Sequence, residues 1–170
     1  MKYTSAEAAK LLRKLNEEHS DIISNESLTK EFVAAVGEDV EGVRPAYDYA
    51  ETQDKLNELE GRIRIVKHAI NAFNVRQEVP GTGMTIDQVL IYIPQLTEKK
   101  RKLGAMQACL PKKRDTANSY GRGAAVIDYR YANYDIKAAR ADYRKVSDEL
   151  AKIQTALDLV NSTETIEIDL

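Results

Sequence analysis

Three side chains have the greatest catalytic potential in this sequence, namely His19, His68 and Cys109. A metal centre needs clustered His, Cys or carboxylate ligands, and di-iron helical bundles place a Glu three residues before a ligating His. Neither histidine has a Glu at that spacing. A cysteine nucleophile needs a base beside it, but the neighbours of Cys109 are alanine and leucine. The sequence therefore predicts no catalytic residue, no metal, no cofactor and no enzyme.

The same three residues fit a structural interpretation. His19 falls on the apolar stripe of the first helix, so we expect it to be partly buried there. His68 lies off the apolar seam of its helix, which predicts an exposed side chain. Cys109 is interpreted as a small apolar residue packed at a helix end.

Cations and tyrosines alternate between residues 112 and 131. Grooves that bind single-stranded nucleic acid combine cations for phosphates with aromatic rings for bases. The sequence pI of about 5.8 argues against this function, because nucleic-acid-binding domains are usually strongly basic. Single-stranded nucleic-acid binding is therefore the alternative function, and a solvated loop with a half-buried strand is the simpler interpretation. The candidate surface comprises Lys112, Lys113, Arg114, Tyr120, Arg122 and Arg130.

Four long helices must position these residues. Thr4 with Glu7, and Thr85 with Gln88, have the spacing of capping boxes. Apolar residues at steps of three and four predict helices over about 4–25, 47–76, 85–108 and 136–160. Pro94 lies inside the third helix and is expected to kink it without ending it. Sustained seams of this spacing indicate coiled-coil-like packing.

The remaining segments are connections and short strands. Residues 28–46 are expected to be irregular, with a short strand or extended arm at residues 32–36 followed by a loop, and a single helical turn as the alternative. Residues 111–132 are a second irregular connection, with a loop over 111–123 and a strand over 127–131. Residues 162–170 alternate and predict a C-terminal strand or tail. The fold class is thus mainly α: an antiparallel bundle of about four long helices with two or three short β-strands, in a single domain over residues 1–170.

The shared spacing of the second and fourth helices predicts one common core. Its members would be Leu59, Ile63, Val66, Ile70, Val146, Leu150, Ile153 and Leu157. If successive helices alternate in direction, these two helices end at the same pole, where the third begins. The sequence therefore predicts a polar cluster that caps helix ends and has no catalytic role. Its members are Asn71, Asn74, Thr85 and Asn161.

Three short motifs carry a family resemblance: Ile70-Asn71-Ala72-Phe73-Asn74, Met84-Thr85-Ile86-Asp87 and Val160-Asn161-Ser162-Thr163-Glu164. In this order they resemble the septicolysin-like family of small, all-helical bacterial proteins, over most of residues 45–165. The resemblance implies a helical architecture and a bacterial source. Through the family's name it also implies a weaker alternative function, that of a membrane-active cytolysin.

Composition bounds the location of the protein. The longest apolar run has five residues, Val89 to Ile93, whereas a membrane span needs about 20. The first residues include no apolar stretch typical of a signal peptide, and a single cysteine excludes an internal disulfide. We therefore expect no membrane span and a cytoplasmic location.

The most consistent functional prediction is a non-catalytic helical interaction or structural protein that self-associates. Residues 26–60 contain ten acids and three bases, whereas residues 99–114 contain seven bases and no acid. Such complementary segments could orient two copies. A lone C-terminal strand must be disordered, fold back on a local partner or pair with another chain. The alternation of Ile166, Ile168 and Leu170 argues against disorder, so we predict a homo-oligomer in which residues 164–170 contact a neighbouring subunit.

Overall fold

The computed structural model describes residues 1–115 and 128–170, and the chain divides into two compact units. Unit 1 comprises residues 1–77 and 159–170, and unit 2 comprises residues 78–158. Both are built from long helices with a few short strands, which confirms the predicted mainly α class. The single domain over residues 1–170 stays a prediction, and the two units are described separately below.

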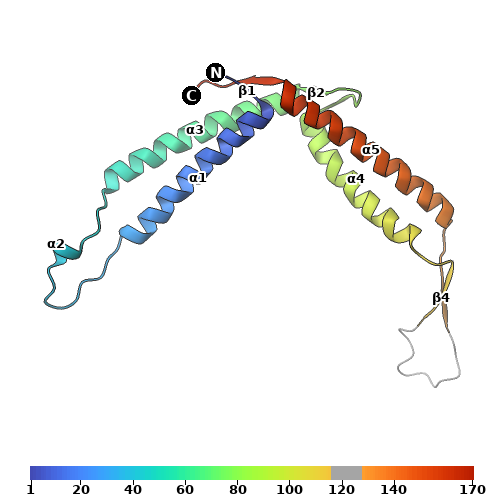
Figure 1. Ribbon diagram of the computed structural model, residues 1–170, viewed down its shortest axis with the longest axis horizontal. Coiled ribbons are helices and arrows are strands. Elements are labelled where there is room, and N and C mark those ends of the chain that lie inside the picture. The colour runs from blue at the N-terminus through green and yellow to red at the C-terminus, as the bar shows by residue number, and fades with distance from the viewer. Residues whose placement is uncertain (116–127) are drawn as a thin grey trace. The chain divides into compact units, whose positions relative to one another are not determined.

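Unit 1 is a helical hairpin. Helices α1 (Ser5–Thr29) and α3 (Tyr49–Arg76) run side by side, and the short helix α2 (Val40–Val43) lies in their connection (Figure 1). The predicted capping box opens α1: Thr4 Oγ1 accepts from the backbone N–H of Glu7 at 3.2 Å, and Glu7 Oε2 accepts from that of Thr4 at 2.8 Å. Asp48 caps α3 by accepting from the backbone N–H of Glu51 at 3.0 Å. Side-chain acceptors thus fix where both helices begin.

The core of unit 1 joins both helices to the C-terminal segment. Its buried residues are Ala8, Leu15, Leu59, Val66, Ile166 and Ile168. The apolar seam of α3 therefore packs against α1 and the C-terminal strand. The sequence assigned this seam to a common core with Val146, Leu150, Ile153 and Leu157, which are also buried but belong to unit 2. Heptad spacing identified the buried positions, but such spacing does not specify which seam packs on which.

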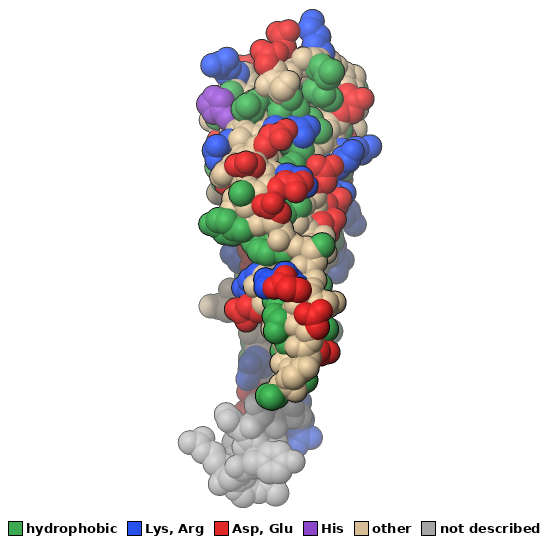
Figure 2. Space-filling view, turned by 90° about the vertical axis from the view of Figure 1, so that its left-hand side faces the viewer, with side chains coloured by type: hydrophobic (Ala, Val, Ile, Leu, Met, Phe, Trp, Pro, Cys, Tyr) green, Lys and Arg blue, Asp and Glu red, His purple; other side chains and the backbone are tan. Residues whose placement is uncertain are grey.

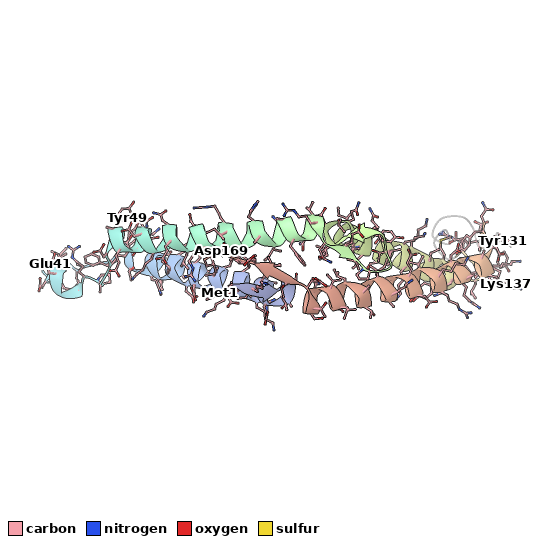
Figure 3. All side chains as sticks on the ribbon, turned by 90° about the horizontal axis from the view of Figure 1, so that it is seen from above. Met1, Glu41, Tyr49, Tyr131, Lys137 and Asp169 are labelled. Carbon is pink, nitrogen blue, oxygen red and sulfur yellow. The ribbon has the colours of Figure 1, made fainter. Side chains whose placement is uncertain are left out.

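The C-terminal segment has a partner within the same chain. Strand β6 (Thr165–Glu167) pairs antiparallel with β1 (Lys2–Thr4), with Tyr3 opposite Ile166. Beyond the strand, the backbone N–H of Ile168 donates to the carbonyl of Met1 at 2.9 Å. Met1 and Asp169 accordingly lie close together in Figure 3. The predicted strand is confirmed, and because β1 pairs with it, the strand does not need a neighbouring subunit. Strand β1 was missed because three residues are too few for an alternating pattern.

The connection between α1 and α3 contains no strand. The helix α1 extends four residues beyond the predicted end, and residues 32–35 are irregular. The backbone N–H of Glu38 donates to the carbonyl of Ala35, so the chain turns here instead of extending. The predicted strand at residues 32–36 is therefore wrong, since a strand needs a hydrogen-bonded neighbour. The single helical turn of the region is α2, further along the chain.

Unit 2 contains a second helical hairpin, made by α4 (Ile86–Gln107) and α5 (Ile136–Thr163), whose last residues belong to unit 1 (Figure 1). The capping box of Thr85 and Gln88 is confirmed, and α4 continues through Pro94 without a break. The Tyr92 hydroxyl donates to Glu149 Oε1 at 2.7 Å across the two helices. A Cβ atom on Gly104 would lie 3.4 Å from the Tyr143 ring, so the absence of a side chain allows close packing there.

Two short hairpins complete unit 2. Strands β2 (Glu78–Val79) and β3 (Met84–Thr85) are joined by a turn in which Gly81 and Gly83 have φ values of 73° and 65°. These left-handed conformations favour glycine, which lacks a Cβ. Strand β4 (Lys112–Arg114) pairs with β5 (Tyr129–Tyr131). The predicted strand is confirmed at residues 129–131, while Ile127 lies outside the described residues. Residues 112–114 were predicted as loop, and a run of three exposed cations gave no strand signal.

Candidate interaction surfaces at the hairpin ends

The β4–β5 pair, here called the basic ribbon (residues 112–114 and 129–131), gathers four of the predicted nucleic-acid residues. Its register places Lys112 opposite Tyr131 and Arg114 opposite Tyr129. Residues that face each other across an antiparallel pair project to the same side. One side of the ribbon therefore carries two cations and two aromatic rings. Tyr131 is labelled at this end of unit 2 in Figure 3.

The aromatic side of the basic ribbon is held by cation–π contacts. Lys112 Nζ lies 4.0 Å from the centroid of the Tyr129 ring and 5.5 Å from that of Tyr131. The two tyrosines remain 46% and 63% exposed. An ammonium over an exposed ring contributes roughly 0.5–1 kcal/mol, which orders the rings while leaving much of their surface accessible.

The other side of the ribbon places two like charges directly opposite each other, Lys113 and Arg130. Like charges in this position destabilise a strand pair. Arg130 Nη2 lies 2.9 Å from Asp115 Oδ2, whose side chain is only 17% exposed. The next pair of the register places Asp115 opposite Asp128, whose carbonyl accepts from the Asp115 backbone N–H at 2.8 Å, so two carboxylates flank the two cations on this side.

A hollow of about 400 Å³ adjoins the ribbon. It is lined by Cys109, Leu110, Lys113, Arg130, Tyr131, Ala132, Asn133 and Tyr134. The Tyr134 hydroxyl donates to the Met106 carbonyl at 2.8 Å, and its interaction with the Cys109 thiol is the main cause that raises the pKa of Tyr134 above the ordinary value. Cys109 is exposed, so its predicted packing role is wrong. It lies two residues beyond the end of α4, between the helix and the ribbon.

The positive charge extends onto the adjoining helix ends. Residues 98–115 and 128–145 contain twelve Lys or Arg and five Asp or Glu. Across the chain, unit 1 has 11 bases and 17 acids, whereas unit 2 has 14 bases and 10 acids. The near-zero net charge of the sequence therefore conceals one acidic and one basic unit.

The acidic end of unit 1 (residues 26–55) is organised around Glu26. Its Oε1 atom accepts from the Tyr47 hydroxyl at 2.6 Å and from Gln53 Nε2 at 2.9 Å. The hydrogen bond to Glu26 raises the pKa of Tyr47 to about 12. These contacts tie the α1–α3 connection to both helices beside a hollow of about 410 Å³. Figure 2 views this side of the molecule and shows acidic side chains interspersed with hydrophobic ones. No local sequence pattern marks this cluster, because its members are 6 to 27 residues apart.

Both histidines lie in unit 1. His19 has a side chain that is 24% exposed, and its Nε2 lies 3.2 Å from Glu60 Oε1 on α3. The predicted partial burial is confirmed, and the link to Glu60 was not foreseen. His68 is exposed, as predicted.

Across residues 1–115 and 128–170, His, Cys, Asp and Glu form no group of three or more that could hold a metal ion. No helix in this described part is long and apolar enough to cross a membrane.

The predicted polar cluster is distributed over both units. Thr85 caps α4 in unit 2, as expected. Asn71 and Asn74 lie in the last turns of α3 and Asn161 in the last turn of α5, all in unit 1. The end of α3 is closed by a backbone bond, from the N–H of Gln77 to the carbonyl of Phe73 at 2.8 Å. A capping role for the three asparagines stays a prediction. Of the predicted nucleic-acid residues, Tyr120 and Arg122 lie outside the described residues.

Comparisons with known proteins relate this chain to one fold. No protein-family model matches it, and neither does any curated protein sequence. The chain is similar to the crystal structure of a functionally unknown conserved protein from Corynebacterium diphtheriae, with a TM-score of 0.65 and 19% sequence identity. The match covers 98% of this chain and 100% of that one. At this identity the similarity shows the fold alone. The resemblance to septicolysin-like proteins stays a prediction.

Proposed function

We propose that this is a non-catalytic interaction protein that self-associates through the sides of its helical hairpins. The observation that carries the proposal is the exposure of aliphatic side chains along the helices of both hairpins. Each hairpin is a single layer of two helices, whereas stable domains usually pack two layers.

The exposed aliphatic side chains lie on helices of both units. In unit 2, Leu90 and Ile91 of α4 are 48% and 58% exposed. In unit 1, Ile23 of α1 and Ile65 of α3 are each 46% exposed. An interface of standard size buries about 1,600 Å² in total. The exposed aliphatic side chains of the two units supply apolar area for such a contact.

A structural use of the polar side chains supports a non-catalytic role. Glu26 is engaged by Tyr47 and Gln53, and Glu149 by Tyr92. These bonds connect neighbouring elements within a unit. They hold the hairpins in shape so that their sides can serve as binding surfaces.

Light scattering on the full-length protein between 1 and 100 μM protein (about two decades in concentration) tests the proposal. We expect a mass that is a multiple of 19.1 kDa. Replacing Leu90 and Ile91 together by Gln should lower it, because these side chains would lose apolar contact area. The control variant Gln95→Ala changes an exposed residue of the same helix and should leave the mass unchanged. A mass of one chain at every concentration would refute self-association.

A further inference from the structure

We propose that the basic ribbon of unit 2 binds single-stranded nucleic acid. In this arrangement the bases stack on Tyr129 and Tyr131, and Lys113 and Arg130 contact phosphates. The inference goes beyond self-association and does not depend on it, because the aliphatic residues invoked for that contact lie on the helices. It rests on the register of the ribbon, the exposure of its rings and the local charge.

The tyrosine spacing suits an extended strand of nucleotides. Tyr129 and Tyr131 are two residues apart on β5, so their Cα atoms are separated by about 7 Å along the strand and their side chains project to one side. Both rings keep a large exposed surface, and Lys112 holds them from one direction. Each ring can therefore stack with one base, which requires bases that are free of pairing.

The opposed pair of Lys113 and Arg130 suits a phosphate. Antiparallel neighbours have Cβ atoms about 4.5–5.5 Å apart, so the two cations share one anionic partner readily. Asp115 contacts Arg130, and Asp128 lies opposite Asp115, so the surplus of positive charge comes from the wider region, where twelve bases outnumber five acids. A phosphate oxygen between these cations would relieve their repulsion, because it accepts hydrogen bonds from both.

The hollow beside the ribbon joins the two functions. Lys113, Arg130 and Tyr131 all line this space of about 400 Å³. A nucleic-acid strand with one base stacked on Tyr131 can thus place a neighbouring phosphate next to the two cations. The net charge of residues 98–115 and 128–145 extends an attractive field around this site.

The whole-chain pI is a poor guide here, because most of the acids belong to unit 1.

The competing occupant of the ribbon is an acidic protein surface, such as the acidic end of a second copy. Carboxylates would satisfy the cations but would leave the exposed rings without a stacking partner. The combination of rings and cations therefore favours nucleic acid.

Fluorescence anisotropy with the full-length protein and labelled 20-nucleotide oligothymidine, at several salt concentrations, tests the proposal. The paired variant Tyr129→Leu with Tyr131→Leu should weaken binding about tenfold or more without changing the salt dependence, since stacking carries no charge. The paired variant Lys113→Gln with Arg130→Gln should weaken binding at low salt. It should also reduce the slope of log affinity against log salt by about 1.4, which corresponds to two lost phosphate contacts.

Two controls separate the proposed site from general charge and from misfolding. Arg64→Gln with Lys67→Gln removes two cations from unit 1 and should change affinity less than about twofold, because these residues lie outside the ribbon. An abasic oligonucleotide of the same length uses the unmodified protein, so its binding does not depend on any variant folding. It should bind about tenfold more weakly than oligothymidine.

Three results would overturn the proposal. The first is no binding of oligothymidine at low salt. The second is equal binding of the abasic strand, which would show attraction to any polyanion without stacking. The third is absent nucleic-acid binding together with a lower mass of the Lys113→Gln, Arg130→Gln variant in light scattering, which would identify a second copy as the occupant. A single-chain mass with intact oligothymidine binding would refute self-association alone.

Discussion

In each unit a short strand pair closes a helical hairpin, but the paired strands are separated by very different lengths of sequence. Unit 1 is closed by pairing β1 with β6, so that Lys2 lies opposite Glu167, from the other end of the described chain. Unit 2 is closed beside α4 by the local β2–β3 turn, in which Val79 lies opposite Met84. Local contacts form at little cost in loop-closure entropy, whereas distant ones require most of the chain to be ordered first. The comparison teaches that the C-terminal segment is part of the core of unit 1 and does not behave as a tail.

The largest expected effect comes from removing an apolar contact that the C-terminal segment brings to unit 1. Ile168 is 2% exposed and belongs to the buried cluster. We expect Ile168→Ala to reduce the free energy of unfolding by about 2–5 kcal/mol, since it leaves a cavity. Chemical denaturation followed by circular dichroism measures this change. The matched variant Leu170→Ala changes a residue that is 52% exposed and should have little effect. Equal losses for both variants would break the comparison.

The capping boxes provide a matched pair across the two units, with a smaller expected effect. Thr4→Ala in unit 1 and Thr85→Ala in unit 2 should each cost about 1 kcal/mol, because each removes the acceptor for a free N–H at a helix start. Thermal or chemical denaturation can measure both. Thr97→Ala, which removes an exposed hydroxyl within α4, is the control and should be close to neutral. If one of these two substitutions left the stability unchanged, the first turn of that helix would already be frayed in the folded protein.

The two boxes should also differ in acid, because only one contains a titratable group. Hydrogen bonds from the Thr4 backbone and hydroxyl lower the pKa of Glu7 below its ordinary 4.5. A carboxyl group whose pKa is lower in the folded state than in the unfolded state stabilises the fold at pH values above the unfolded-state pKa. This stabilisation is lost as the pH falls through the folded-state pKa. Glu7→Gln should therefore reduce the stability difference between pH 7 and pH 3. Gln88 takes the place of Glu7 in unit 2, so Gln88→Ala should lower stability equally at both pH values.

The smallest effect concerns the phenol that anchors the acidic end of unit 1. The pKa of Tyr47 is raised to about 12 by its hydrogen bond to Glu26. A proton bound more tightly in the folded state stabilises that state below pH 10, and this contribution is lost between pH 10 and 12. Ultraviolet titration of the phenolate should show a component near pH 12 that disappears in Tyr47→Phe. Tyr49→Phe, at an exposed neighbour, is the control. If Tyr49→Phe removed this component and Tyr47→Phe did not, its assignment to Tyr47 would be wrong.

Individual residues show where sequence reasoning succeeded. The spacing of Leu59 and Val66, and of Val146 and Leu150, identified buried positions because apolar residues at helical intervals must face a partner. Thr4 and Thr85 marked helix starts because a capping box is a local interaction. The failures involve partners that are distant in the sequence, such as Tyr47 with Glu26, or β4 with β5.

The basic ribbon shows the same distinction within the candidate site. Lys113 and Arg130 were both selected from composition, but only the strand register places them opposite each other. Asp115, which contacts Arg130, was not selected, because an acid beside a basic run suggests solvent exposure. The sequence does contain a signal for this strand pair. Lys112 and Arg114 are two residues apart, as are Tyr129 and Tyr131, and two segments with this spacing can face each other across an antiparallel pair.

The sequence by itself determined the helices, most of their ends and the residues that each helix buries, because periodicity and capping act over a few residues. It also determined the chemical character of each segment, including the acidic and basic runs. The tertiary structure decided which seam packs on which, how the chain divides into two units, and that the last strand returns to the first. Those choices depend on long-range pairing, where several partners satisfy the same apolar pattern and only the packed arrangement selects among them.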